Sequence, residues 1–129
     1  MAFAPTVTAR NTQADALLAR LNKVTTTAGA IVFHTSGHAV VATCVFADTA
    51  FHAAVNGVAA SYAIGNGTTT AGTIAHAHLV TEGGTDLGQL SVTTYGGGGD
   101  IEVQSAGSTL AFGTGETISV SSGSFTQPA

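Results

Sequence analysis

Short apolar runs, each closed by turn-forming residues, recur along the chain from residue 30 onward. They are built mainly from Val, Ile, Thr and Ala, and β-branched residues at a period of two, interrupted by Gly, Asn or Ser, are typical of antiparallel sandwiches and barrels. The pattern predicts strands at 30–34, 39–47, 57–64, 72–81, 88–95, 100–104, 108–112 and 116–126. The predicted fold class is therefore mainly β: an antiparallel β-sandwich, jelly-roll-like, with one short N-terminal helix.

The helix is predicted at residues 12–23, inside a single domain that covers residues 12–129. Thr12 and Asp15 have the spacing of an N-cap followed by an acidic first-turn residue. Four apolar residues recur at i, i+3, i+4 and i+7 and form one stripe: Ala14, Leu17, Leu18 and Leu21. This stripe covers either the open end of the chain's own sandwich, which we favour, or a neighbouring subunit.

Residues 1–11 show little periodicity and contain Pro5, so they are predicted to form an extended arm. Such an arm is free to contact a neighbouring molecule. Together with the helix stripe, it supplies the candidate partner-binding residues: Phe3, Pro5, Val7, Leu17 and Leu21.

Charged residues are scarce, which narrows the possible partners. Asp, Glu, Lys and Arg make up 8% of the 129 residues, against about a quarter in ordinary soluble domains. The net charge is −4, and the three permanent cations all precede residue 24, so we expect no nucleic-acid partner. The start resembles no signal peptide, and no apolar run approaches a membrane span, so we expect synthesis in the cytoplasm and no membrane partner.

Histidines are the residues that raise the question of a metal site. His76 and His78 lie two apart on a predicted strand and therefore share a face. A zinc site needs further ligands, which His34, His38 and His52 supply only if several strands or loops converge. Because no Cys-x-x-Cys or His-Glu-x-x-His spacing prepares such a site, we favour a solvated or interfacial histidine pair, with no metal and no cofactor.

Catalytic patterns are weak in the same way. No Gly-x-Ser-x-Gly motif sets a serine beside a base. Asp100 and Glu102 share one strand face, but a glycosidase pair would also need an aromatic-lined cleft. Cys44 lies in an apolar stretch and is predicted to be a buried, inert thiol. We therefore predict no catalytic residues and no enzyme.

Several segments together resemble small virion proteins of tailed bacteriophages. The helical segment 14–22 leads into the strand 30–33, and these are followed by the block 44–64, a Gly-Gly hairpin at 81–85 and a Ser/Thr-Val-Ser ending at 117–128. Within the block, the relatives have the pattern F-x-D-x-A-F-x-x-A-x-x-G-V-A, matched here by Phe46, Asp48, Ala50, Phe51, Ala54, Gly57, Val58 and Ala59.

The resemblance implies a virion building block with no reaction of its own. The leading hypothesis is a capsid decoration, or cement, protein on the outer surface of the head, with the major capsid protein as partner and a homotrimer as the favoured oligomer. The alternatives are a tail, neck or fibre component. A glycan-binding module that uses Tyr62, Tyr95 and His76 as a shallow platform is the alternative from another class.

Overall fold

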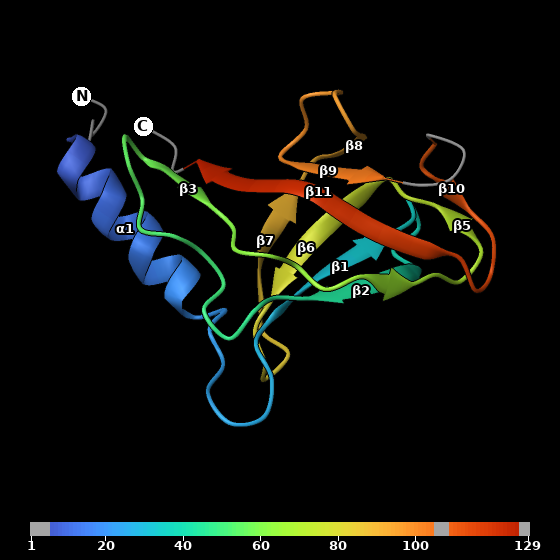
Figure 1. The fold of residues 1–129 in the computed structure, drawn as a ribbon, viewed down its shortest axis with the longest axis horizontal. Coiled ribbons are helices and arrows are strands. Elements are labelled where there is room, and N and C mark those ends of the chain that lie inside the picture. The colour runs from blue at the N-terminus through green and yellow to red at the C-terminus, as the bar shows by residue number, and fades with distance from the viewer. Residues whose placement is uncertain (1–5, 105–108, 127–129) are drawn as a thin grey trace.

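The structure is a computed structural model that describes residues 6–104 and 109–126, and for 121–126 the backbone only. It contains helix α1 (Val7–Ala19) followed by strands (Figure 1). The strands are β1 (Ala30–His34), β2 (Val40–Val45), β3 (Val58–Ala60), β4 (Gly67–Thr68), β5 (Gly72–Thr73), β6 (His76–Val80), β7 (Asp86–Leu90), β8 (Val92–Thr94), β9 (Ile101–Gln104), β10 (Ala111–Phe112) and β11 (Thr117–Thr126). The predicted class, mainly β with one short helix, is confirmed.

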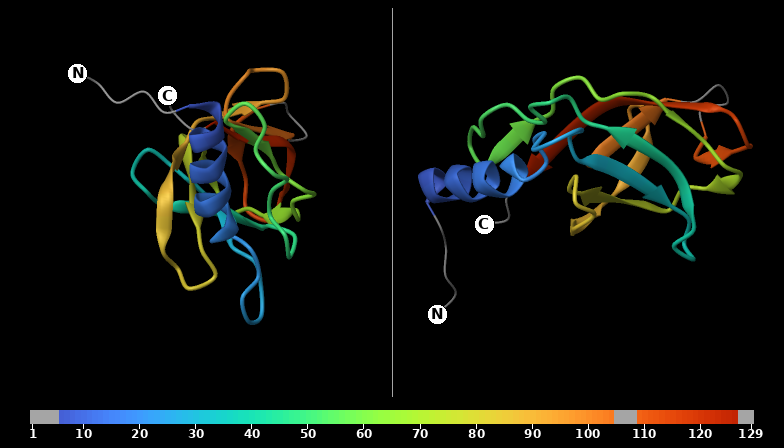
Figure 2. Two further views of the ribbon diagram at one scale, coloured as in Figure 1. Left: turned by 90° about the vertical axis from the view of Figure 1, so that its left-hand side faces the viewer. Right: turned by 90° about the horizontal axis from the view of Figure 1, so that it is seen from below.

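The strands form two larger sheets and one small one. The first sheet has the order β2-β1-β6-β7 and is antiparallel throughout. The second has the order β3-β11-β9-β8, and β4 also pairs with β11. Strands β10 and β5 form a two-stranded sheet. In Figure 1 the long strand β11 runs across the strands of the first sheet, and Figure 2 shows α1 at one end of the sheets.

One pairing departs from the antiparallel prediction, because β8 and β9 are parallel. The short connection 95–100 returns the chain to the start of the neighbouring strand. Gly96 and Gly98 within it have φ values of 86° and 81°, which cost glycine little. The connection is ordered by specific bonds: Thr93 Oγ1 accepts the backbone N–H of Gly99 at 3.0 Å.

The helix begins earlier and ends earlier than predicted. Thr6 is the N-cap, and its Oγ1 accepts the backbone N–H of Ala9 at 3.1 Å. Thr12 is inside the helix, where its hydroxyl donates to the Thr8 carbonyl at 3.0 Å. The predicted arm is therefore wrong for residues 7–11, because the signal of Thr6 as a cap was overlooked. Phe3 and Pro5 lie outside the described residues.

The core lies between the sheets and under the helix. Ile31 and Phe33 of β1 and Leu79 of β6 are buried on one side of it. The opposing sheet contributes a second group of buried side chains: Ile101, Val103 and Ile118. The helix adds Ala14 and Leu18, and the turn that follows it adds Leu21. The stripe thus covers the chain's own domain, as favoured, and burial of these apolar surfaces is the main force that holds the helix in place.

Candidate metal centre

Four histidines meet on the outer face of the first sheet. His34 is the last residue of β1, and His76 and His78 lie in β6. The β1–β6 register sets His34 opposite His76 and Val32 opposite His78. Because side chains alternate along a strand, these three histidines share one face, while their neighbours Phe33 and Ala77 point into the core.

The fourth histidine comes from the turn between β1 and β2. His38 has a φ of 67°, a left-handed conformation that is uncommon for residues other than glycine. The turn is closed by the His38 N–H, which donates to the Thr35 carbonyl at 2.9 Å. The His38 ring then lies beside β6, where its Nδ1 is 3.3 Å from Nε2 of His76.

The four side chains converge closely enough to share one ion. Each offers one ring nitrogen, and these four nitrogens all lie within 4.8 Å of one another. A metal site requires several strands or loops to bring further histidines to His76 and His78, and the fold brings His34 and His38 there. His52 does not take part, since its ring stacks on Tyr62 with centroids 3.7 Å apart.

Asp86 of β7 orients one member of the cluster. Its Oδ2 lies 2.7 Å from Nδ1 of His78, and its Oδ1 accepts the backbone N–H of Gly88 at 2.9 Å. Burial raises the pKa of Asp86, but the contacts with His78 and Gly88 outweigh this effect, so the pKa is lower than its ordinary value. The carboxylate therefore stays ionised beside the cluster.

The environment favours uncharged imidazoles. Burial, followed by the nearby His78, His76 and His38, lowers the pKa of His34. Burial also lowers the pKa of His76, with His38 and His78 as further causes. The neutral imidazole is the form that binds metals, because a lone pair on one ring nitrogen is then free.

Three ring nitrogens in the cluster are buried without a hydrogen bond of good geometry among the described residues: Nδ1 of His34 and both nitrogens of His78. Nδ1 of His78 has the Asp86 carboxylate 2.7 Å away, so Nδ1 of His34 and Nε2 of His78 are the two that remain without a partner. A buried polar atom left unpaired costs about 1–3 kcal/mol, so such atoms are rare in folded proteins. A cation held between the rings would satisfy both nitrogens. Imidazole ligands suit divalent zinc, copper, nickel and iron.

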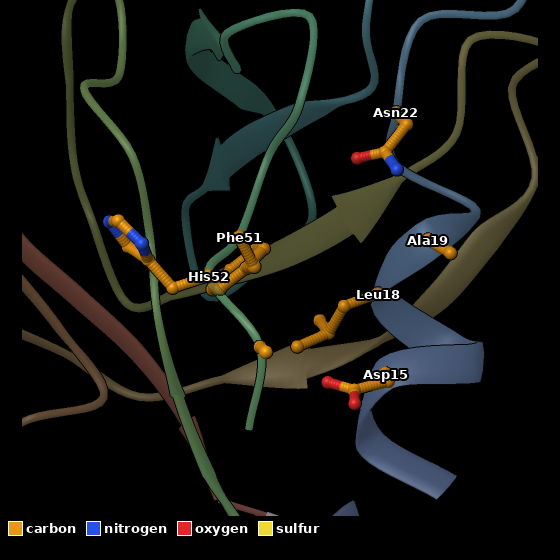
Figure 3. A pocket seen from close by; sticks show the side chains of 7 residues that line it. Asp15, Leu18, Ala19, Asn22, Phe51 and His52 are labelled. Carbon is orange, nitrogen blue, oxygen red and sulfur yellow. The ribbon is translucent and has the colours of Figure 1, made fainter. Parts of the chain in front are cut away.

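A small pocket of about 200 Å³ lies where α1 meets the segment 51–53 (Figure 3). Asp15 and Leu18 point from the helix toward this segment, while the His52 ring points away from the helix. Asp15 Oδ1 accepts the Ala54 N–H at 2.8 Å, and Asn22 Oδ1 accepts the Ala50 N–H at 2.9 Å. The polar side chains here fasten the helix to the domain.

The carboxylates considered for catalysis also have structural partners. Asp100 Oδ2 accepts both the backbone N–H and the hydroxyl of Ser91 at 3.1 Å. Glu102 Oε2 accepts the Gly98 N–H at 2.9 Å. Both carboxylates therefore order the glycine-rich connection between β8 and β9.

The predicted partner-binding residues have different environments. Val7 is exposed at the start of α1, and Leu17 is half-buried. Leu21 has an exposed fraction of 0%, so its prediction as a partner contact is corrected to a core position. The proposed glycan platform is not assembled in the described part of the chain, because His76 is buried against the other histidines and Tyr62 stacks on His52.

The sequence contains a signal for this cluster that our prediction undervalued. His34 and His38 flank a short turn, and His76 and His78 alternate on a strand, so each pair is pre-aligned locally. What the sequence does not give is the pairing of β1 with β6, which brings the two pairs together.

Comparisons with protein-family profiles, curated proteins and solved structures find no match to this chain. Among the described residues, no helix has the length and apolar character that a membrane crossing requires.

Proposed function

We propose that this protein is a non-catalytic structural component of a tailed-bacteriophage virion, and specifically a capsid decoration protein. The observation that carries the proposal is an exposed apolar patch at the helix end of a domain that has very few charges. The sequence resemblance to small virion proteins supports the class of assembly that we propose.

The helix-end patch consists of Val7, Val55 and Val58, whose exposed fractions are 43%, 67% and 40%. Val55 and Val58 bridge the two-residue turn Asn56–Gly57. The Gly57 N–H donates to Asn11 Oδ1 at 2.7 Å, which holds this turn against the first turns of α1. Val7 precedes Asn11 by one helical turn, so the three valines lie at the same end of the molecule.

An exposed apolar patch favours contact with another protein surface, and the Arg10 side chain, which lies against Gly57, is a charged neighbour of this patch. The chain has only ten charged side chains of the Asp, Glu, Lys and Arg types, three of them cationic. On a capsid, repeated binding by many copies adds stability to the shell, because each copy that binds only the assembled lattice shifts the equilibrium toward it. A homotrimer around a threefold axis would present three such patches together to the capsid surface.

The proposal is tested by adding the purified protein to phage heads that lack it and imaging them by electron microscopy. Saturable density in a regular lattice on the head supports the proposal. Density confined to the neck, tail or fibres would indicate that the protein occupies another position in the virion. A lack of association with any phage particle would overturn the proposal.

A matched pair of variants tests the patch itself. The double variant Val55→Ser, Val58→Ser is expected to weaken head binding by at least tenfold. Val24→Ser is the control, because Val24 is 78% exposed in a loop away from the patch. Equal binding by both variants would show that the helix-end patch is not part of the interface with the head.

A further inference from the structure

We propose that His34, His38, His76 and His78 form a binding site for one divalent transition-metal ion of zinc-like chemistry, and that this ion has a structural role. The inference does not depend on the virion role, because it concerns the isolated chain. It rests on the convergence of four ring nitrogens, on two buried unpartnered nitrogens and on an oriented carboxylate.

The separations suit a compact tetrahedral ion. Ligand nitrogens about 2.0–2.1 Å from a tetrahedral zinc ion are about 3.3–3.4 Å apart. Nδ1 of His38 and Nε2 of His76 are already 3.3 Å apart, and one ring nitrogen from each of the four histidines lies within 4.8 Å of the others. Closing the set requires shifts of at most about 1.5 Å, the difference between 4.8 and 3.3 Å, which side-chain rotation can provide.

The donor atoms follow from the other contacts of each ring. His78 would bind through Nε2, because its Nδ1 lies against Asp86 and its Nε2 is buried without a partner. His34 retains Nδ1 as its unpartnered nitrogen. A carboxylate that holds the far nitrogen of a ligating histidine fixes the tautomer and the ring orientation, which is the usual arrangement around zinc.

A set of four protein ligands leaves no position for substrate, which distinguishes structural zinc sites from catalytic ones. The ion would tie the β1–β2 turn to β6, two segments about forty residues apart. Because the histidines lie on the outer face and the core fills the opposite face, the domain is expected to fold without the ion and to gain rigidity at this turn when the ion binds.

The first experiment measures zinc bound by the protein after its affinity tag has been removed. The chain is dialysed against excess Zn²⁺ and then against metal-free buffer, and the retained metal is measured by mass spectrometry. We expect one Zn²⁺ per chain and a melting temperature that rises until one equivalent has been added. Retention of no zinc by the wild-type protein would overturn the proposal.

Variants assign the ion to the cluster. His76→Gln is expected to abolish stoichiometric binding, while His52→Gln is the matched control and is expected to keep it, because His52 lies outside the cluster. Melting curves without metal check folding of each variant. Asp86→Asn removes no ligand, and a 10–100-fold loss of zinc affinity is expected from the loss of orientation. Equal retention by wild type and His76→Gln, or loss with His52→Gln, would contradict the site.

Cobalt reports the geometry. Co²⁺ bound by four histidines in a tetrahedral arrangement gives intense visible absorption, whereas an octahedral site with water ligands absorbs weakly. We expect the intense spectrum in the wild type and its weakening in His38→Gln. A weak spectrum in the wild type, or a spectrum unchanged in His38→Gln, would rule out the four-histidine ion.

Discussion

The carboxylate of Glu82 accepts the backbone N–H of Thr26 at 2.8 Å, across 56 residues of the chain. The same carboxylate accepts the N–H groups of Val24, Thr25 and Thr27 and the hydroxyl of Thr25. The Thr26 amide first, and then Thr25 and Thr27, hold the pKa of Glu82 far below its ordinary value of 4.5. One side chain thus orders the whole loop after the helix.

Replacing Glu82 by Gln is therefore expected to lower the melting temperature at neutral pH. Because the folded-state pKa is lowered, the ionised carboxylate contributes its full stability above the ordinary pKa, and this contribution is lost as the pH falls below about 4.5. Wild type and variant should converge as the solution becomes more acidic, which melting curves from pH 7 downward would measure. Asp48→Asn is the control, because Asp48 is mostly exposed and 3.9 Å from Lys23. A difference in melting temperature between wild type and Glu82→Gln that stays constant with pH would contradict this role of Glu82.

Side chains of α1 and of the turn that follows it accept backbone N–H groups from the segment 50–57, and these bonds hold the helix in place. Asn22→Ala removes the acceptor of the Ala50 N–H and should cost about 1–2 kcal/mol of unfolding free energy, since Ala50 is fully buried. Chemical denaturation measures the loss. Gln13→Ala, on the exposed side of α1, should change the free energy by less than about 0.5 kcal/mol. If both variants lose the same stability, the hydrogen bonds to the segment 50–57 do not hold the helix in place.

Gly67 allows a close approach of β4 to β2. A Cβ atom at this position would lie 2.7 Å from the Thr43 carbonyl oxygen and 3.2 Å from Cys44 Sγ. Gly67→Ala is expected to destabilise the fold by about 1–3 kcal/mol, because the backbone must move apart. Gly83→Ala is the matched control, as its nearest neighbour would be 4.0 Å away. A calorimetric melt that shows no difference between the two would contradict the steric argument.

Cys44 should be unreactive while the protein is folded. Its side chain has an exposed fraction of 0%, and burial raises the pKa of the thiol to about 11. At pH 8 the thiolate fraction is then about one in a thousand. Labelling by a thiol reagent is expected to proceed only as fast as unfolding exposes the residue. A native-state labelling rate close to that of the denatured chain would show that the thiol is accessible.

The sequence was most informative where alternation and turn chemistry agree. Strand β1 has the predicted bounds, 30–34, and the Asn56–Gly57 turn has positive φ at both residues, 53° and 78°, as that pair favours. Two-residue strands such as β4 and β5 carry too few positions for a pattern, so β4 was not predicted and β5 was merged with β6.

Predictions failed where an outcome depends on contacts between distant segments. Asn66–Gly67 reads locally as a hairpin turn, but Gly67 begins β4 and pairs with Ile118. The histidine cluster depends on the β1–β6 register and on the unusual backbone of His38, neither of which any local pattern specifies. Local propensity is silent about such pairings because their energy comes from burial and register.

Alternate positions of β6 serve separate purposes. Ala77 and Leu79 maintain the interior, and His76 and His78 face the other way. Evolution can therefore exchange the outward-facing residues with little penalty to folding, so related proteins are free to keep an identical interior while they diverge, or lose, whatever chemistry the opposite surface performs.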